Sequence, residues 1–171
     1  MCGLVGVFGN IIQNDVKFFS QSLIADYFRG KHSTGLLAVS DRTKDVVVHK
    51  QALDPITFLD LKRVDREINT TKLCLAGHNR HATLGGVNSE NAHPFTHGDI
   101  TLMHNGTLTN KAALERKFDA PKFDTDSELV CWLVDNYDLN QVIESLEGAF
   151  ALIWWDASTS KLNVVRNSER P

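Results

Sequence analysis

Residues 1–9 of the chain read Met-Cys-Gly-Leu-Val-Gly-Val-Phe-Gly. The apolar run from Leu4 to Phe8 predicts a buried strand that begins at the terminus, and a terminus docked in a sheet is held still, whereas most chain ends fray. We expect Met1 to be removed, because small Cys2 permits it. Cys2 would then carry a thiol nucleophile and an α-amine base on one carbon, since an α-amine titrates at about pH 7.7–8.0. The alternative is that Cys2 is an ordinary small apolar residue.

Composition limits the classes to which the chain can belong. Its 171 residues suit one domain, and the hydrophobic and charged fractions, 42% and 23%, are typical of a globular protein. The net charge of −3 comes without a basic run, so nucleic-acid binding is not expected. No apolar stretch is long enough to span a membrane, and no basic segment marks a secretory signal. Three widely spaced cysteines without a CxxC pair favour a reducing compartment, so we expect a cytoplasmic protein.

Periodicity predicts alternating helices and strands. Helices are expected from a cap at Asn14-Asp15 to Arg29-Gly30, over 55–68, 111–118, 127–136 and 139–146. Strands are expected at 35–40, 45–49, 73–77, 100–104, 149–155 and 162–165. The first two of these strands are joined by the polar turn 41–44, and a long polar loop covers 79–98. This pattern indicates an α/β or α+β domain with helices packed on largely antiparallel sheets.

The polar segments carry a series of short motifs. They are Cys2-Gly3-Leu4-Val5-Gly6, Arg29-Gly30-Lys31-His32-Ser33-Thr34-Gly35, Arg80-His81-Ala82-Thr83, Asn91-Ala92-His93-Pro94, His104-Asn105-Gly106, Asp124-Thr125-Asp126-Ser127-Glu128 and Val165-Arg166-Asn167-Ser168. In order and spacing the series resembles the glutaminase domain of class II glutamine amidotransferases, which are N-terminal-nucleophile hydrolases. It is most similar to the branch containing glucosamine-6-phosphate synthase and the purine phosphoribosyl amidotransferase.

The resemblance implies an α+β fold, the four-layer αββα sandwich of the N-terminal-nucleophile hydrolases. One glutaminase domain would cover residues 1–171. Family domains carry further strands beyond the equivalent of 166–168, and then a synthase domain. We therefore expect a domain shortened at its C-terminus, without the closing strands and without a synthase domain.

The resemblance also implies catalytic roles for Cys2, Asn105 and Gly106. The Cys2 thiol would attack the side-chain amide of glutamine, with its own α-amine as base and then as acid for departing ammonia. The Asn105 side chain and the Gly106 backbone N–H would stabilise the oxyanion. The resulting thioester on Cys2 would hydrolyse to glutamate.

Further residues match the substrate-binding and loop positions of the family. Arg80 would clamp the substrate α-carboxylate, Thr83 would add a hydroxyl beside it, and Asp126 would pair with the α-ammonium. His81 and His104 are placed beside the substrate, and the expected loop-holding residues are Arg29, Gly30 and His93. Three positions depart from the family pattern. His81 replaces an aromatic residue, Leu84 replaces a histidine, and His32 stands two residues after Arg29-Gly30, where the family often has an acidic residue.

Plainer interpretations exist for several of these residues. Asn105-Gly106 is also typical of a tight turn after a strand, and either Asp124 or Thr125 is expected to cap the following helix. Cys74 and Cys131 fit core positions. Five histidines gather at 78–104, but their spacing matches no recognisable site, so neither a metal nor another cofactor is expected.

Two hypotheses for function follow, with a metal-dependent hydrolase as a distant third. The first is a glutamine amidotransferase whose partners are L-glutamine and a synthase protein in trans, to which ammonia is passed. The alternative is a catalytically idle domain that binds glutamine or a synthase partner as a regulator. A nucleophile, oxyanion donors and both substrate clamps kept together favour the enzyme.

Overall fold

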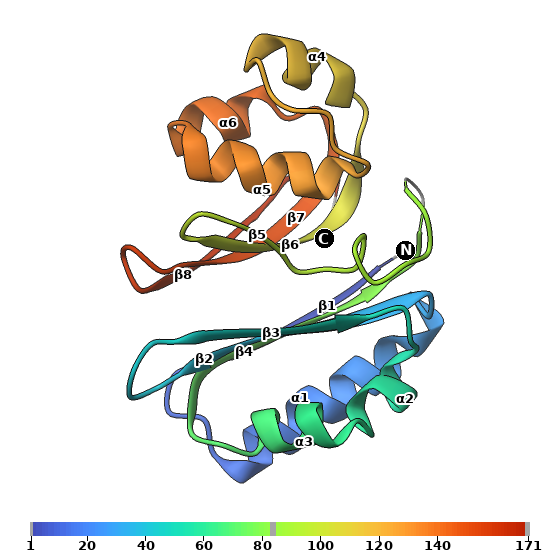
Figure 1. Cartoon of the computed structure of the whole chain (residues 1–171), viewed down its shortest axis with the longest axis vertical. Coiled ribbons are helices and arrows are strands. Elements are labelled where there is room, and N and C mark those ends of the chain that lie inside the picture. Colours follow the sequence, from blue (N-terminus) through green and yellow to red (C-terminus); the bar gives the residue numbers. More distant parts are fainter. Residues whose placement is uncertain (1, 83–84, 170–171) are drawn as a thin grey trace. The chain divides into compact units, whose positions relative to one another are not determined.

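A computed structural model describes residues 2–82 and 85–169 of the chain. It divides into two compact units, and each is treated separately below. The first unit contains residues 1–82 and 86–94, and the second contains residues 83–85 and 95–171. Each unit has one four-stranded sheet with helices against it (Figure 1).

The sheet of the first unit has the strand order β1-β4-β2-β3, and all its neighbours are antiparallel. The strands are β1 (Gly3–Phe8), β2 (Ser33–Ser40), β3 (Val46–Gln51) and β4 (Lys72–Arg80). The predicted first strand is confirmed, but its predicted burial is wrong. β1 lies at the sheet edge, and among its residues only Gly3 is buried, while Phe8 is 56% exposed. Successive side chains of a strand point to opposite faces, and the helices of this unit cover only one face of the sheet (Figure 1), so the apolar run is not buried throughout.

Helices of the first unit cover one face of this sheet (Figure 1). They are α1 (Gln13–Ala25), the 3₁₀ turn η1 (Asp26–Phe28), α2 (Pro55–Leu59) and α3 (Lys62–Ile68). The apolar core between helices and sheet contains Val16, Phe19, Leu23, Leu36, Ala38, Phe58, Val64, Ile68 and Leu75. The expected helix cap at Asn14-Asp15 is displaced: α1 begins at Gln13, and the Asp15 carboxylate accepts the backbone N–H of Ile12 at 3.0 Å.

The single helix predicted over 55–68 is wrong, because the chain forms two helices there. The backbone of Leu61 is extended, which ends α2 and starts α3. Phe58 and Val64 are both buried, yet six residues of continuous α-helix would turn them about 120° apart. The break therefore lets both side chains reach the same core.

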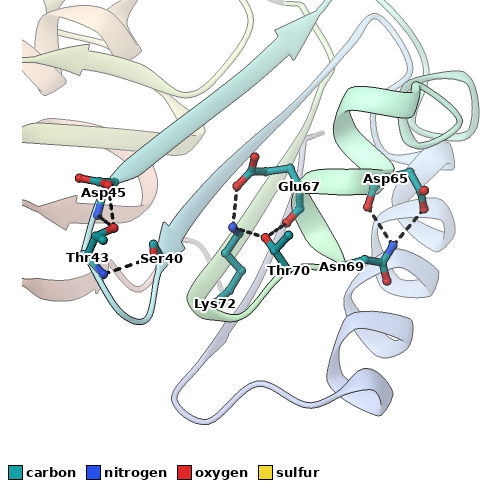
Figure 2. Close-up of polar contacts among 8 residues, drawn as sticks. All are labelled: Ser40, Thr43, Asp45, Asp65, Glu67, Asn69, Thr70 and Lys72. Carbon is teal, nitrogen blue, oxygen red and sulfur yellow. Dashed lines mark hydrogen bonds and ion pairs between the residues drawn. The ribbon is translucent and has the colours of Figure 1, made fainter.

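Polar contacts fix two of the turns in this unit, as Figure 2 shows. In the β2–β3 turn, predicted at 41–44, the Thr43 hydroxyl donates to Asp45 at 2.6 Å and the Thr43 N–H donates to Ser40 at 3.3 Å. Between α3 and β4, the Lys72 ammonium is 7% exposed and pairs with Glu67 at 2.6 Å. A buried ammonium needs such a partner, so this ion pair fixes the start of β4.

The sheet of the second unit has the order β5-β6-β7-β8, again antiparallel. Its strands are β5 (Phe95–His97), β6 (Ile100–Leu108), β7 (Gly148–Asp156) and β8 (Lys161–Arg166), covered by α4 (Lys111–Lys117), α5 (Asp126–Asn136) and α6 (Leu139–Ser145) (Figure 1). These helices and the last two strands confirm the prediction. The predicted loop 79–98 is partly wrong, because β4 continues to Arg80 and β5 occupies Phe95–His97.

In the described residues, no helix is both long and apolar enough to cross a membrane.

Candidate active site

The predicted site residues divide between the two units. Those in the first unit are Cys2, Arg29, Gly30, Arg80, His81 and His93, and those in the second are His104, Asn105, Gly106 and Asp126. Thr83 and Leu84 lie outside the described residues.

Cys2 is held by contacts to its sulfur and to its backbone. The His81 N–H donates to the Cys2 Sγ at 3.4 Å, and the Arg29 Nε donates to the Cys2 carbonyl oxygen at 3.1 Å. The thiol is partly exposed. This arrangement fixes the orientation of the residue and leaves its sulfur accessible, which is what a nucleophile requires.

Asp26 lies against Gly3, the residue after Cys2, and belongs to none of the sequence motifs. A Cβ at Gly3 would overlap the Asp26 carboxylate, so glycine is needed where β1 meets η1. The same carboxylate lies 3.7 Å from the Arg29 Nε. Burial raises the pKa of Asp26 and the Arg29 charge opposes this rise. The only signal in the sequence was the spacing of Asp26 and Arg29 within one helical turn.

Arg80 ends β4 and is only 4% exposed. Its Nη1 donates to the Gly86 carbonyl oxygen at 2.9 Å, and the Asn91 side chain donates to the same oxygen at 3.4 Å. The guanidinium thus holds the loop that follows β4. Gly30 packs against the end of this strand as well, because a Cβ there would lie 2.6 Å from the Asn79 carbonyl oxygen.

Two departures from the family pattern are in contact with each other. The His32 and His81 rings stack with centroids 4.8 Å apart, and the Ala82 N–H donates to the His32 Nδ1 at 3.0 Å. Burial lowers the pKa of His32, and the neighbouring His81, Lys31 and Arg80 lower it further. Beside them lies a cavity of about 210 Å³, lined by Tyr27, Phe28, Gly30, Lys31 and His81.

His93 packs within the first unit. Its ring centroid lies 3.9 Å from that of His78, and a Cβ at Gly35 would overlap its carbonyl oxygen. Both rings are buried. Throughout residues 2–82 and 85–169, no three histidine, cysteine, aspartate or glutamate residues are grouped to hold a metal ion.

In the second unit, β6 carries His104, Asn105 and Gly106. The tight turn that Asn105-Gly106 suggested is wrong, because both residues lie within the strand. Asn105 pairs with Ala151 and Gly106 with Phe150 of β7. The direction of the Gly106 N–H is therefore set by the strand and not by a turn.

The direction of the Gly106 N–H follows from its neighbours. The Leu108 N–H donates to Asp126 at 2.8 Å, away from β7, and amides two residues apart in a strand point to the same edge. The N–H and the carbonyl of Phe150, opposite Gly106, bond Asn167 instead of β6. Gly106 and Phe150 thus form a non-hydrogen-bonded pair, and the Gly106 N–H points away from β7.

This edge of β6 is open at Gly106. Pairing with β5 ends at Phe95–Leu102, so in the described part of the chain no strand covers β6 on that side beyond Leu102. A Cβ at Gly106 would overlap the Ala149 carbonyl oxygen and lie 2.5 Å from the His104 Nε2. Only glycine fits here.

Asn105 has a buried side-chain oxygen that accepts no hydrogen bond from residues 2–82 or 85–169. An unsatisfied buried polar atom costs about 1–3 kcal/mol. Such a cost in a native strand calls for an explanation, and a functional role is one. The side-chain oxygen of Asn105 is therefore a buried hydrogen-bond acceptor that the fold of the described residues does not use.

Asp126 lies at the start of α5, and Thr125 caps this helix by accepting the Glu128 N–H at 3.1 Å. The expected choice between Asp124 and Thr125 is thus settled. Asp126 is 5% exposed. Its Oδ2 accepts the Leu108 N–H, and its Oδ1 accepts the Ser127 hydroxyl at 3.4 Å. Since a carboxylate has about four acceptor positions, Oδ1 keeps capacity for another donor.

The chain matches known proteins over most of its length. The sequence profile of a family described as "Glutamine amidotransferase domain" matches residues 78–169. A glutamine–fructose-6-phosphate aminotransferase (isomerizing) of Gluconobacter oxydans is 32% identical over 157 residues, which are 90% of this chain and 25% of the relative. The corresponding enzyme of Thermococcus kodakarensis is 32% identical over 187 residues, which are 98% of this chain and 29% of the relative.

A solved structure shares the fold. The glutamine phosphoribosylpyrophosphate amidotransferase from B. subtilis superposes with a TM-score of 0.68 at 21% identity, covering 91% of this chain and 35% of that chain. This confirms the predicted α+β fold of the N-terminal-nucleophile hydrolases. The chain spans about a quarter to a third of the length of the proteins that it matches. By its profile match and its fold, the chain belongs to the family of class II glutamine amidotransferase domains.

Proposed function

We propose that this domain hydrolyses the side-chain amide of L-glutamine to glutamate and ammonia through a thioester on Cys2. The observation that carries the proposal is the open edge of β6, where the Gly106 N–H and the Asp126 carboxylate lie on the same side. The Gly106 and Leu108 amides are about 6.8 Å apart along the strand, and Asp126 accepts from Leu108. From bond lengths, extended glutamine measures about 6 Å between its α-nitrogen and its side-chain oxygen.

The chemistry follows from these residues. After Met1 is removed, the Cys2 amine takes the thiol proton, and the sulfur attacks the amide carbon. The Gly106 N–H and the Asn105 side-chain N–H stabilise the oxyanion, each donor contributing about 2.7–4 kcal/mol in comparable enzymes. The amine then protonates the departing ammonia. Water attacks the thioester, the C–S bond breaks, and glutamate leaves with the thiol restored.

The remaining roles are part of the same proposal. Asp126 binds the α-ammonium, and Arg80 and Thr83 bind the α-carboxylate, with His81 and His104 beside the substrate. Arg29, Gly30 and His93 hold the surrounding backbone. No cofactor takes part in this scheme.

The fate of ammonia is suggested by the relatives. The Gluconobacter and Thermococcus proteins are aminotransferases, and they are longer than this chain. We propose that ammonia passes to an acceptor site on a synthase protein in trans. Three free cysteines support a reducing compartment, and hence the cytoplasm, as the place of action.

A second candidate function is a catalytically idle domain that binds glutamine or a synthase partner. The observation that favours it is the burial of Arg80 and its hydrogen bond to Gly86, because a guanidinium committed to the protein has less capacity for a substrate. The stacked His32 and His81 rings alter the same region.

The test is the intact mass of the purified protein before and after exposure to 6-diazo-5-oxonorleucine, an electrophilic mimic of glutamine. We expect loss of Met1 and one adduct, absent in Cys2→Ala and slowed by glutamine. Burial raises the pKa of Cys74 and of Cys131 to about 12, so neither thiol should react, and Cys74→Ala is the matched control. Retained Met1, or a free Cys2 without an adduct, would support the idle domain instead.

A further inference from the structure

We infer that His104 and Ser127 are positioning residues which, with Asp126, hold the oxyanion strand β6 in its working register. We call these three residues the β6 clamp. The inference deepens the proposed function and rests on it. It links the group that binds the α-ammonium of glutamine to the strand that carries the oxyanion donors.

The contacts of the β6 clamp lie on both sides of Gly106. Two residues after Gly106, the Leu108 N–H donates to the Asp126 Oδ2 at 2.8 Å. Two residues before it, the His104 Nδ1 lies 3.0 Å from the Ser127 Oγ. Since Asp126 and Ser127 are adjacent in α5, the start of one helix fastens β6 at two points that flank the oxyanion donor.

The inference gives each hydrogen bond a direction. A carboxylate can only accept, and the Ser127 hydroxyl is assigned as donor to the Asp126 Oδ1, 3.4 Å away. The Ser127 oxygen then accepts from the Nδ1–H of His104. This assigns the Nδ1–H tautomer to neutral His104 and leaves a lone pair on its Nε2. A hydroxyl that donated to the His104 Nδ1 instead, 3.0 Å away, would require the opposite tautomer.

The ring of His104 lies directly against Gly106. Residues 104 and 106 share one face of β6, and the Nε2 lies 2.5 Å from where a Gly106 Cβ would be. His104, Ser127 and Asp126 are all buried, so water does not compete for their hydrogen bonds. Rotation of the ring would therefore disturb the backbone at Gly106.

The substrate ammonium would bind at the Asp126 Oδ1, which also accepts the hydrogen bond of the Ser127 hydroxyl. Substrate binding is in this way connected to the other residues of the β6 clamp. Loss of the Ser127 hydroxyl should leave Asp126 bonded to Leu108 and able to bind ammonium, while His104 loses its fixed tautomer. The expected defect is therefore in the transition state, which needs the oxyanion donors, and much less in ground-state binding.

The experiment compares Ser127→Ala, Ser127→Thr and the matched control Ser145→Ala in the full chain after loss of Met1. Ser145 also carries a hydrogen-bonded hydroxyl on a helix of the second unit. We expect Ser127→Ala to lower kcat for glutamine hydrolysis about tenfold with KM within about twofold, and Ser127→Thr to restore kcat. Ser145→Ala should leave both constants unchanged.

Nitrogen-15 NMR of the imidazole rings gives a second readout, which reports the tautomer directly. We expect His104 of the wild-type protein to carry its proton on Nδ1 at pH 7.5, and Ser127→Ala to lose this preference. A wild-type His104 protonated on Nε2, or a Ser127→Ala variant with unchanged kcat, would overturn the inference. So would a rise in KM alone, since Ser127 would then serve only the ammonium site.

The two proposals fail in different ways. If the wild-type protein neither hydrolyses glutamine nor forms the Cys2 adduct, the proposed function fails. If it does both, and the tautomer or the Ser127→Ala kinetics disagree with expectation, the β6 clamp alone is wrong.

Discussion

Two regions are held in place differently: the start of the first unit, with the proposed nucleophile Cys2, and β6 of the second unit, with the proposed oxyanion donor Gly106. Cys2 precedes an edge strand, is partly exposed, and is fixed by Arg29 and by the His81 N–H. Gly106 lies inside β6, opposite the buried Phe150 and next to the buried Asn105. We therefore expect changes at Cys2 to affect the chemistry alone, and changes in β6 to affect chemistry and stability together.

The largest effect is expected at Cys2. Cys2→Ala should lower glutamine hydrolysis at least about 10⁴-fold, since it removes the nucleophile, yet change the free energy of unfolding by less than about 0.5 kcal/mol. Activity assays and urea unfolding followed by circular dichroism measure both. A large loss of stability would contradict the separation of chemistry from fold at this end of the chain.

Gly106→Ala should lower both the activity and the stability of the protein. The new Cβ overlaps the Ala149 carbonyl oxygen, so we expect a loss of about 2–3 kcal/mol of unfolding free energy and a decrease in kcat of about 10²–10³-fold. Gly86→Ala is the matched variant in the first unit, because its Cβ would make only an ordinary contact with the Asn88 side chain and should change the free energy of unfolding by less than about 0.5 kcal/mol. Equal losses in the two variants would contradict the difference between the two regions.

Glu115 tests the stability of the second unit without touching the candidate site. Its carboxylate bonds Lys111 and Lys122, both at 2.7 Å, and these bonds lower the pKa of Glu115 from 4.5 to about 2. A lowered pKa stabilises the fold above pH 4.5, and this stabilisation is lost as the pH falls toward 2.

We expect Glu115→Gln to lower Tm by about 4 °C at pH 7, with the difference from the wild type shrinking between pH 4.5 and pH 2. Tryptophan fluorescence is the suitable probe, since Trp132, Trp154 and Trp155 all lie in the second unit. A difference in Tm that is constant with pH would rule out the charge as its origin.

The smallest effect is expected at His32 in the first unit. Its lowered pKa means that the unfolded chain binds a proton more readily, so its contribution to stability is lost as the pH falls below about 6.5. His32→Asn keeps an acceptor for the Ala82 N–H and should reduce the loss of stability between pH 6.5 and pH 5. Hydrogen exchange in peptides covering residues 26–40 measures it.

Local signals predicted most of the elements and failed where contacts distant in sequence decide the structure. The polar turn 41–44 and the helix cap before Asp126 could be predicted, because turns and caps are determined by a few adjacent residues. Asn105-Gly106 has the composition of a turn, but pairing with Ala151 and Phe150 makes it a strand. The break at Leu61 could not be predicted, because Phe58 and Val64 each fit a helical pattern. Only the structure shows that both side chains pack in the same core, which one continuous helix would not allow.

The candidate site shows the same division. Family motifs supplied the predicted residues, and the structure describes all of them except Thr83. Asp26 carried only the weak signal of its spacing to Arg29, and Ser127 stood in a family motif without an assigned role. The importance of each lies in what it contacts: Gly3 for one, and His104 for the other. Such contacts depend on how η1 meets β1 and how α5 meets β6.

The open edge of β6 would allow a substrate to be recognised by the backbone of the sheet. A strand edge offers backbone donors to an incoming strand, and proteins commonly guard such edges against pairing with other chains. β5 pairs with β6 only as far as Leu102, so among the described residues no strand pairs with the Gly106 amide on that side. A glutamine whose side-chain carbonyl oxygen accepts the Gly106 N–H would take the place of a neighbouring strand at this one residue. The edge of the sheet would then be covered while substrate is bound and uncovered again when the product leaves.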